Sequence, residues 1–463
     1  MNEARRTTSG RLALAAGPGF ALAAGLAAQA GGLSPAVAVT LALTVWCALW
    51  WVLEPVDGAV TALVPLALLP ATGVLTPKQV AESYGNELIL LFAGGFMLSM
   101  AMERSGAHRR LALAMVRAFG GADGRRVVYG FVAATGFISM WMSNTATTLM
   151  VLPVALAVLE SYPDRRLAAP LVLAIAYAAS IGGLGTPIGT APNLVFMQVY
   201  EQTTGVRMGF LEWMAFGVPV IAIFLPLAAW WLARDLKGSP PATLPALGAW
   251  QPAERRVLTV FALVALAWIT RTEPFGGWTA LVGLHGVNDA SIALAGVVVL
   301  AVMPDGRGDR LLTWDAAVRI PWGALVLFAG GIALATAFQS SGLSDLVAAR
   351  LAALRDVPVP LLMLLIAASV TLISEMASNT ATAVLLMPIL AATGTAIGVD
   401  PALLMVPAVL AASCGFMLPV ATAPNLIAYG TGRVTNRRMI REGAMLDAIG
   451  VLVIAAVSYL VIG

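Results

Sequence analysis

The chain has 463 residues, of which 59 % are hydrophobic and 11 % are charged, with a formal net charge of +3 and a mean hydropathy of +0.87. Soluble globular proteins carry about 25 % charged residues, so this composition excludes a soluble domain and indicates an integral membrane protein. The two cysteines and two histidines exclude a disulfide framework, a thiolate metal cage and a His-rich metal site.

Apolar runs follow one another along the whole chain, without the ten-residue alternation of a membrane β-barrel. The first run, 12–30, follows three arginines and ends in Ala28-Gln29-Ala30, like a signal peptide, but we expect it to be retained as the first span. The others lie at about 35–53, 57–75, 86–103, 127–160, 167–200, 209–233, 256–271, 279–303, 322–340, 357–397, 401–429 and 443–462.

Two of these runs, 127–160 and 357–397, are too long for one crossing, since a straight span needs about 20 residues. Each carries the sequence Ser-Asn-Thr-Ala-Thr near its middle, at Ser143–Thr147 and Ser378–Thr382. We interpret each as a re-entrant hairpin that enters and leaves on the same side. The sequence then predicts an all-α integral membrane protein with 11 transmembrane helices plus two re-entrant hairpins.

The positions of lysine and arginine agree with this topology. With the N-terminus inside, 22 of the 27 basic residues are cytoplasmic and five lie outside, as the positive-inside rule requires. Counting 127–160 as a full crossing would instead place the basic residues of 234–256 outside. We therefore expect a cytoplasmic N-terminus and a periplasmic or extracellular C-terminus. The preference for arginine over lysine favours a bacterial source and hence the cell inner membrane.

The chain also repeats itself. Leu91–Gly95 recurs as Leu327–Gly331 at an offset of 236, the two Ser-Asn-Thr motifs are offset by 235, and Ala191-Pro192-Asn193 returns as Ala423-Pro424-Asn425. The predicted topology places corresponding segments on opposite sides, so the repeats are inverted, as in many secondary transporters. The predicted parts are an N-terminal helix (1–34), inverted repeat 1 (35–233), a cytoplasmic linker (234–255) and inverted repeat 2 (256–463).

Two short amphipathic stretches, 108–119 and 345–354, follow the repeated Ser-Gly pairs and are predicted to be interfacial helices. Two further segments, 185–193 and 419–425, combine Gly, Pro, Thr and Asn inside apolar runs and predict broken helices. Free carbonyls at such breaks suit a hard cation such as sodium, whereas helix N-termini and hydroxyls suit an anionic oxygen.

Lysine and arginine are absent between Arg126 and Arg165 and between Arg355 and Arg433. An anion at the two motifs must therefore be held by neutral donors, helix dipoles and bound cations, which favours cation coupling. Asn193 and Asn425 are expected to tie off broken backbone rather than to bind a ligand. Glu375, the only acid in the core of the second hairpin, has either a structural role or a role in proton uptake.

The paired Ser-Asn-Thr motifs, the Thr-Ala-Pro-Asn breaks and Leu-Phe-Ala-Gly-Gly resemble the divalent anion/sodium symporters, the DASS or INDY-like dicarboxylate transporter family, over essentially the whole chain. The resemblance implies a membrane-embedded homodimer in which a transport domain moves elevator-fashion against a scaffold domain. It implies sodium-coupled import of a small dianionic substrate (succinate, fumarate or malate), with at least two co-transported sodium ions and no nucleic acid partner.

The same resemblance assigns site residues by motif. The first sodium site would use Ser139, Ser143, Asn144 and Gly189, and the second Ser374, Ala377, Asn379 and Ala421. The substrate carboxylates would meet Ser143, Asn144, Thr145, Thr190, Ser378, Asn379, Thr380 and Thr422. Ser374 stands where threonine is common, which leaves an oxygen ligand in place. Ala191 and Ala423 stand where some dicarboxylate transporters have proline, so citrate and sulfate remain alternative anions.

Three other functions are open to the sequence. A sodium-independent dicarboxylate exchanger of the same family would need a basic side chain in place of the cation, and none is evident at either motif. A sodium/proton antiporter or anion exporter on a related scaffold would need titratable residues, and the motifs offer only Glu375. An enzyme would need a nucleophile with a base, or metal ligands at a suitable spacing, and neither pattern occurs.

Overall fold

The computed structural model describes residues 8–119, 123–238, 240, 248–273 and 276–463. Over these residues the chain is helical, and its β-structure is limited to one isolated antiparallel bridge between Pro304 and Arg310. The predicted all-α fold is therefore confirmed. The start of the predicted N-terminal helix (1–7) and most of the middle of the predicted linker (239 and 241–247) lie outside the described residues.

The first half of the chain forms α1 (Thr8–Ala30), α2 (Pro35–Leu53), α3 (Gly58–Ala71), α4 (Pro77–Tyr84), α5 (Glu87–Ser105), α6 (Ala107–Ala118), α7 (Gly124–Ser139), α8 (Asn144–Ser161), α9 (Ala168–Gly182), α10 (Ala191–Thr204) and α11 (Phe210–Leu232). The second half forms α12 (Pro252–Ile269), α13 (Gly277–Leu281), α14 (Asp289–Val302), α15 (Trp314–Ala317), α16 (Trp322–Ser341), α17 (Leu343–Leu351), α18 (Val359–Ser374), α19 (Asn379–Ile397), α20 (Ala402–Ala411), α21 (Ala423–Gly430) and α22 (Asn436–Ile462). Short 3₁₀ turns occupy Arg165–Leu167, Gly183–Gly185 and Ala352–Asp356.

Eight helical segments among the described residues are long and apolar enough to cross a membrane. Five shorter apolar helices accompany them: α3, α8, α14, α18 and α20. The chain is thus a multi-pass membrane protein, as its composition predicts.

Every predicted interruption is present. The run 127–160 breaks between Ser139 and Asn144, and the run 357–397 breaks between Ser374 and Asn379. Each break falls at the Ser-Asn-Thr motif, whose serine is the N-cap residue of the helix that follows. At the first break the Ser143 hydroxyl also accepts from the Ala146 amide at 3.2 Å. The run 167–200 breaks between α9 and α10, and the run 401–429 between α20 and α21.

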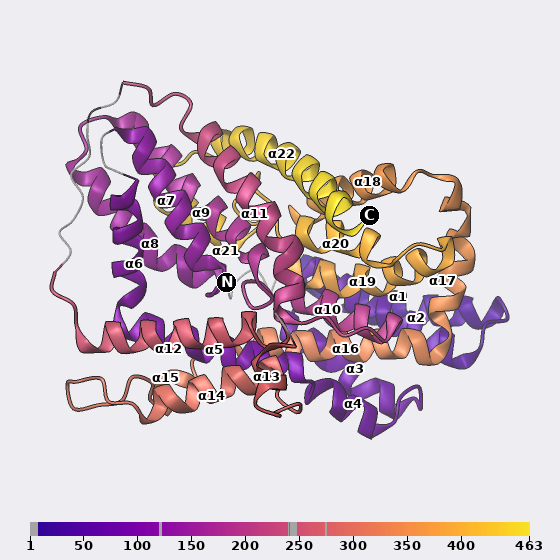
Figure 1. Cartoon of the computed structure of the whole chain (residues 1–463). Coiled ribbons are helices and arrows are strands. Elements are labelled where there is room, and N and C mark those ends of the chain that lie inside the picture. The colour runs from indigo at the N-terminus through magenta and orange to yellow at the C-terminus, as the bar shows by residue number, and fades with distance from the viewer. Residues whose placement is uncertain (1–7, 120–122, 239, 241–247, 274–275) are drawn as a thin grey trace.

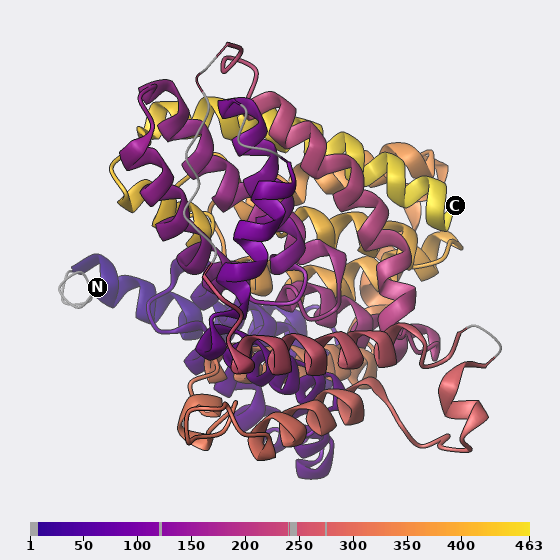
Figure 2. The same cartoon turned by 60° about the vertical axis from the view of Figure 1, so that its left-hand side comes forward.

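Both views of the ribbon show the helices in two layers (Figures 1 and 2). The lower layer holds α3, α5, α12, α14 and α16, and the pairs α3–α16, α5–α14 and α12–α14 pack together within it. The upper layer holds the interrupted runs, with α7 and α8 against α9, α11 against α22, and α18 against α20. The C-terminus lies in the upper layer.

The two predicted amphipathic stretches are helices α6 and α17, close to their expected positions. Each follows a glycine with positive φ, Gly106 at +76° and Gly342 at +83°, where a residue with a Cβ would be strained. The turn redirects the chain from the end of α5 or α16 into the short helix. On α6 the buried side chains Ala112, Leu113 and Val116 lie on one face, which explains its amphipathic sequence.

Candidate functional site

Four helices begin at the predicted site. Their N-cap residues are four of the residues predicted to meet the substrate: Ser143 for α8, Thr190 for α10, Ser378 for α19 and Thr422 for α21. Ser143 and Thr422 use their hydroxyls to cap their own helices, whereas Thr190 and Ser378 make no such bond and keep theirs available. Because helix N-termini carry unpaired amides and partial positive charge, all four favour an anion.

A cluster of three oxygens stands at the first motif. The Ser139 hydroxyl lies 2.9 Å from the Asn144 side-chain oxygen and 2.7 Å from the Ala179 carbonyl oxygen. The hydroxyl has one proton, so it can fully satisfy only one of these two acceptors. Ser139 is fully buried, and Asn144 is partly exposed at the start of α8. The arrangement leaves lone pairs crowded together, which a bound cation would stabilise.

The second motif builds the same cluster. The Ser374 hydroxyl lies 2.9 Å from the Asn379 side-chain oxygen and 2.5 Å from the Ala412 carbonyl oxygen. Ser374 is fully buried like Ser139, and the two acceptors come from corresponding positions of the helix after the motif and of the neighbouring broken helix. The Ser374 hydroxyl thus occupies the same place in the second cluster as the Ser139 hydroxyl does in the first.

The predicted backbone ligands lie beside these clusters. A Cβ placed on Gly183 would stand 2.4 Å from the Asn144 side-chain oxygen, and one placed on Gly189 would stand 2.4 Å from the Gly183 carbonyl oxygen. In the second half, a Cβ placed on Gly415 would stand 3.1 Å from the Ala421 side chain and 3.2 Å from the Ser374 carbonyl oxygen. The chain approaches this closely only because glycine occupies three of these positions.

The remaining predicted residues lie around the same breaks. Ala377 immediately precedes the Ser378 cap, and its amide donates to Ile373 O at 3.0 Å. Thr145 is exposed and Thr380 is partly exposed, each one residue after the motif asparagine. Apart from Thr422, which is buried, the residues predicted to contact the substrate are therefore more exposed than Ser139 and Ser374.

The side chains of Asn193 and Asn425 hydrogen-bond to backbone carbonyls at the helix breaks, as the sequence predicts. The Asn193 amide donates to Gly183 O at 3.0 Å and to Thr186 O at 2.8 Å. The Asn425 amide donates to Gly415 O at 2.9 Å and to Leu418 O at 3.0 Å. Both side chains are fully buried, and within the described part of the chain neither amide oxygen has a hydrogen-bond partner.

Unpartnered buried oxygens occur in matching pairs in the two halves. Besides the two asparagines, the buried hydroxyls of Thr135 and Thr371, Thr147 and Thr382, and Ser180 and Ser413 have no partner among the described residues. An unsatisfied buried polar group is costly, so native structures keep few of them without a ligand, ion or water nearby. Their position around both motifs fits a site that binds polar cargo.

The two halves differ in how the motif is attached to the broken helix. In the first half the Thr186 hydroxyl donates to the Met140 carbonyl oxygen. In the second half the hydrogen bonds run in the opposite direction: the turn at the motif supplies the acceptor, the Glu375 carboxylate, and the broken helix supplies the donors, the amides of Met417 and Leu418, each at 2.8 Å. The structural role considered for Glu375 is thus present. Sequence reasoning did not find Thr186 or the partners of Glu375, since the bonds join residues 42 to 46 positions apart.

Contacts between the halves bring the four breaks together. The arm α8 packs against both α9 and α21, and the arm α19 packs against both α20 and α10. Tyr177 of α9 donates to the Phe416 carbonyl oxygen at 2.9 Å, and the Phe416 amide donates to Asp447 at 3.2 Å. Each motif helix therefore contacts the broken helix of its own half and that of the other.

Comparison with known proteins places these features in a family. The family model described as the sodium:sulfate symporter transmembrane region matches residues 16–461. A sodium-dependent dicarboxylate transporter, SdcS, of Staphylococcus saprophyticus is 38 % identical over 460 residues, which is 94 % of this chain and 88 % of that protein. SdcS of Staphylococcus aureus strain USA300 is 38 % identical over 446 residues, covering 91 % and 85 %.

Among solved structures, the Alcanivorax borkumensis YdaH transporter, whose crystal structure is described as having an unusual topology, matches with a TM-score of 0.57 at 16 % identity. The match covers 85 % of this chain and 87 % of the other. At this identity the likeness concerns the fold alone.

Proposed function

This chain belongs to the sodium:sulfate symporter family, and we propose that it is a sodium-coupled symporter that imports C4 dicarboxylates. It is a transport protein rather than an enzyme, as its family and its relatives are. The relatives named sodium-dependent dicarboxylate transporter support both parts of the proposal, sodium as the coupling ion and a dicarboxylate as the substrate.

The two oxygen clusters carry the proposal. Sodium binds hard, neutral oxygens, and each cluster offers a hydroxyl, an amide oxygen and a carbonyl oxygen. One sodium ion would be bound by Ser139, Ser143, Asn144 and Gly189, and a second by Ser374, Ala377, Asn379 and Ala421. Each ion would satisfy the acceptors that a single serine proton leaves unpaired.

The helix N-termini support a dianionic substrate. Ser143, Thr190, Ser378 and Thr422 cap helices from two halves that pack against each other, so two carboxylates can each be met by one pair of caps. Asn144, Thr145, Asn379 and Thr380 add polar groups in the first turns. Since lysine and arginine are absent from both motifs, the sodium ions supply the positive charge that binds the substrate.

We propose the family's architecture for this chain: 11 transmembrane helices plus two re-entrant hairpins, arranged as two inverted repeats. The matching breaks and the matching serine–asparagine–carbonyl clusters support the repeats. The two layers seen in Figures 1 and 2 are suited to a scaffold and an elevator-type transport domain. A homodimer in the cell inner membrane, with the N-terminus in the cytoplasm, completes the proposal.

The membrane potential sets a minimum for the number of sodium ions that must accompany each dianion. Moving one elementary charge across 100 mV costs about 2.3 kcal/mol, so a dianion entering an inside-negative cell costs about 4.6 kcal/mol. Two sodium ions cancel this charge and make transport electroneutral. A third ion would let the membrane potential drive uptake.

The test is radiolabelled succinate uptake into proteoliposomes with an inward sodium gradient, compared with potassium or choline. The wild-type chain should accumulate succinate only with sodium, and Asn144→Ala and Asn379→Ala should each abolish uptake. Uptake that requires internal dicarboxylate and ignores sodium would identify an exchanger and refute the cation argument. Uptake of sulfate or citrate but not succinate would keep the mechanism and change the substrate.

A further inference from the structure

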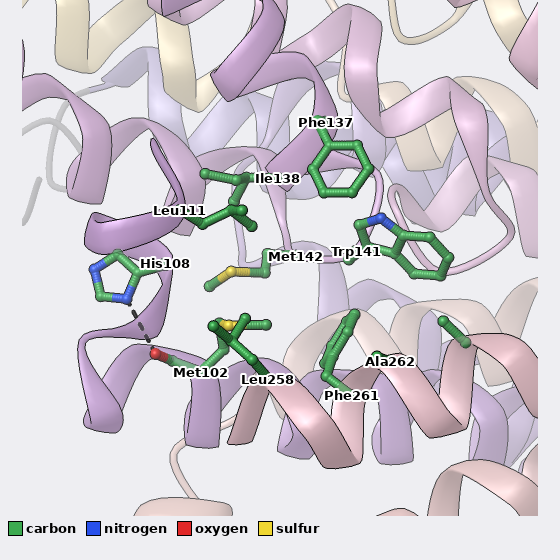
Figure 3. A pocket seen from close by; sticks show the side chains of 11 residues that line it. Met102, His108, Leu111, Phe137, Ile138, Trp141, Met142, Leu258, Phe261 and Ala262 are labelled. Atoms are coloured by element: carbon green, nitrogen blue, oxygen red, sulfur yellow. Dashed lines mark hydrogen bonds between the residues drawn. The ribbon is translucent and has the colours of Figure 1, made fainter. Parts of the chain in front are cut away.

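A cavity that is separate from the oxygen clusters lies between the first Ser-Asn-Thr motif and the lower layer of helices. Its volume is about 310 Å³. Figure 3 shows Phe137 and Ile138 of α7 and Trp141 of the following turn on one side, with Phe261 and Ala262 of α12 facing them. The cavity therefore lies between the turn at the first Ser-Asn-Thr motif, in the upper layer, and helix α12 of the lower layer.

The interior of this cavity is apolar. None of the eleven described residues that line it is aspartate, glutamate, lysine or arginine. His108 is its one titratable residue, and burial lowers the pKa of the imidazole, so at neutral pH the ring is uncharged. The His108 Nδ1 donates to the Met102 carbonyl oxygen at 3.0 Å, as Figure 3 shows, which satisfies that ring nitrogen. A hydrocarbon chain suits these walls and a polar ligand does not.

The cavity is open on the side that faces lipid. Phe137 is 43 % exposed and Ala262 is also exposed, whereas Trp141 and Phe261 on the inner side are 9 % and 8 % exposed. In a chain that spans the membrane, a side chain exposed at this depth contacts acyl chains. A lipid can therefore enter without unfolding any helix.

Positive charge gathers where α6 and α12 begin, on the side that the arginine distribution assigns to the cytoplasm. Arg110 and Arg255 both lie over the exposed Trp250 ring, 4.5 and 5.8 Å from its centroid. Arg110 also pairs with Glu254 at 2.8 Å. With exposed Arg109 and with Arg256, the segments 108–110 and 254–256 carry four arginines against one glutamate.

We propose that this cavity binds one acyl chain of an anionic phospholipid from the cytoplasmic leaflet, with the headgroup held by the arginines at the starts of α6 and α12. Basic pockets between helices on the cytoplasmic side, with a tryptophan at headgroup depth, suit such lipids. A zwitterionic lipid would gain the apolar contacts but not the attraction to Arg109 and Arg255.

A lipid bound in the cavity would stabilise the turn that carries the first Ser-Asn-Thr motif. Trp141 packs edge-on against Phe261 with ring centroids 5.7 Å apart and stacks on Phe210 at 6.0 Å. Trp141 lies two residues before Ser143, so a chain lodged beside it supports the turn from which α8 starts.

The test is photolabelling in phosphatidylcholine vesicles that contain a trace of phosphatidylglycerol with a diazirine midway along one acyl chain. Label should appear on the peptides that contain Phe137–Met142 and Leu258–Ala265. Excess unlabelled phosphatidylglycerol should remove it, and the same excess of phosphatidylcholine should not. The readout is binding, so it is independent of whether the protein transports succinate.

Two variants of α12 provide a matched pair. Ala262→Trp fills the cavity and should abolish labelling of both peptides. Leu263→Trp adds the same ring one residue away, at a lipid-facing position that does not line the cavity, and should leave the labelling unchanged. The double variant Arg109→Gln/Arg255→Gln should reduce the preference for phosphatidylglycerol by about 30-fold. Equal labelling of the two tryptophan variants would refute the cavity, and equal competition by both lipids in the wild type would refute the anionic headgroup.

Discussion

The substitution Gly183→Ala tests the first sodium site with a single methyl group. Gly183 lies in the 3₁₀ turn after α9 and has ordinary helical φ and ψ, so alanine is allowed by the backbone. The new Cβ would, however, stand 2.4 Å from the Asn144 side-chain oxygen and 3.1 Å from its nitrogen. A real contact needs at least 3.0 to 3.4 Å, so the asparagine oxygen must move by roughly 0.6 to 1.0 Å.

The magnitude follows from this displacement. Overpacking of this kind costs about 1–3 kcal/mol, and 1.4 kcal/mol corresponds to a factor of ten in an equilibrium constant. Because the Asn144 oxygen is bonded to Ser139 and belongs to the oxygen cluster, the displacement weakens sodium binding. We expect the KM for sodium to rise by about 10-fold to 100-fold.

The assay is the initial rate of succinate uptake into proteoliposomes as a function of external sodium. Gly430→Ala is the matched control, because no described atom beyond its chain neighbours and the nearby backbone of α21 lies within 4 Å of the added Cβ. Gly415→Ala in the second half meets its neighbours only at 3.1 and 3.2 Å, so it should raise the KM for sodium less than Gly183→Ala does. An unchanged KM for sodium in a folded Gly183→Ala protein would refute the assignment of Asn144 to a sodium site.

Three further substitutions test other parts of the structure. Asn193→Ala removes two buried hydrogen bonds and takes the side-chain donor from the Gly183 carbonyl oxygen, while the Thr186 carbonyl oxygen keeps its bond from the Gly189 amide. The free energy of unfolding should therefore fall by about 2 kcal/mol, seen as a lower Tm in detergent; an unchanged Tm would contradict the role of Asn193 in stabilising the helix break. Glu375→Gln replaces one carboxylate oxygen by an NH₂ group that faces a backbone amide, so the KM for sodium should rise about tenfold, and an unchanged KM would show that the carboxylate does not position Ser374. Lys78→Cys should react with a membrane-impermeant maleimide in intact cells, against a low background because Cys47 and Cys414 are buried; reaction only after the cells are opened would invert the proposed topology.

The breaks were predictable because the residues that cause them are local. Serine or threonine before a helix start caps the helix and ends the preceding run, as at Ser143 and Thr422, and at Thr422 a proline in the first turn adds to the signal. The short helix α4 could have been found in the same way, since Thr76, Pro77 and Gln79 form a capping box that the sequence displays. Local chemistry therefore defined the positions of the site helices, and the family resemblance supplied the roles of their residues.

Contacts between distant segments could not be predicted in this way. Nothing near Tyr177 in the sequence indicates that its hydroxyl meets the Phe416 carbonyl oxygen, 239 residues away. The cavity beside Trp141 likewise depends on how α7 and α12 approach each other across the two layers. Packing of this kind is decided by the fit of whole helix faces, which hydrophobic periodicity alone does not specify.

The two halves of the site present the same oxygen atoms, but they differ in the hydrogen bonds that connect each motif to its broken helix. Ser139 and Ser374 are surrounded by the same kinds of oxygen at nearly the same distances, so repetition alone accounts for the two oxygen clusters. The first turn, however, is attached by one neutral hydroxyl, that of Thr186, while the second is attached by a carboxylate with two backbone donors. Hydrogen bonds to a charged group contribute about 1.5–3 kcal/mol and neutral ones about 0.5–1.5 kcal/mol. Removing the Glu375 charge should therefore weaken sodium binding more than Thr186→Val does, although both substitutions act one bond away from the proposed sodium sites.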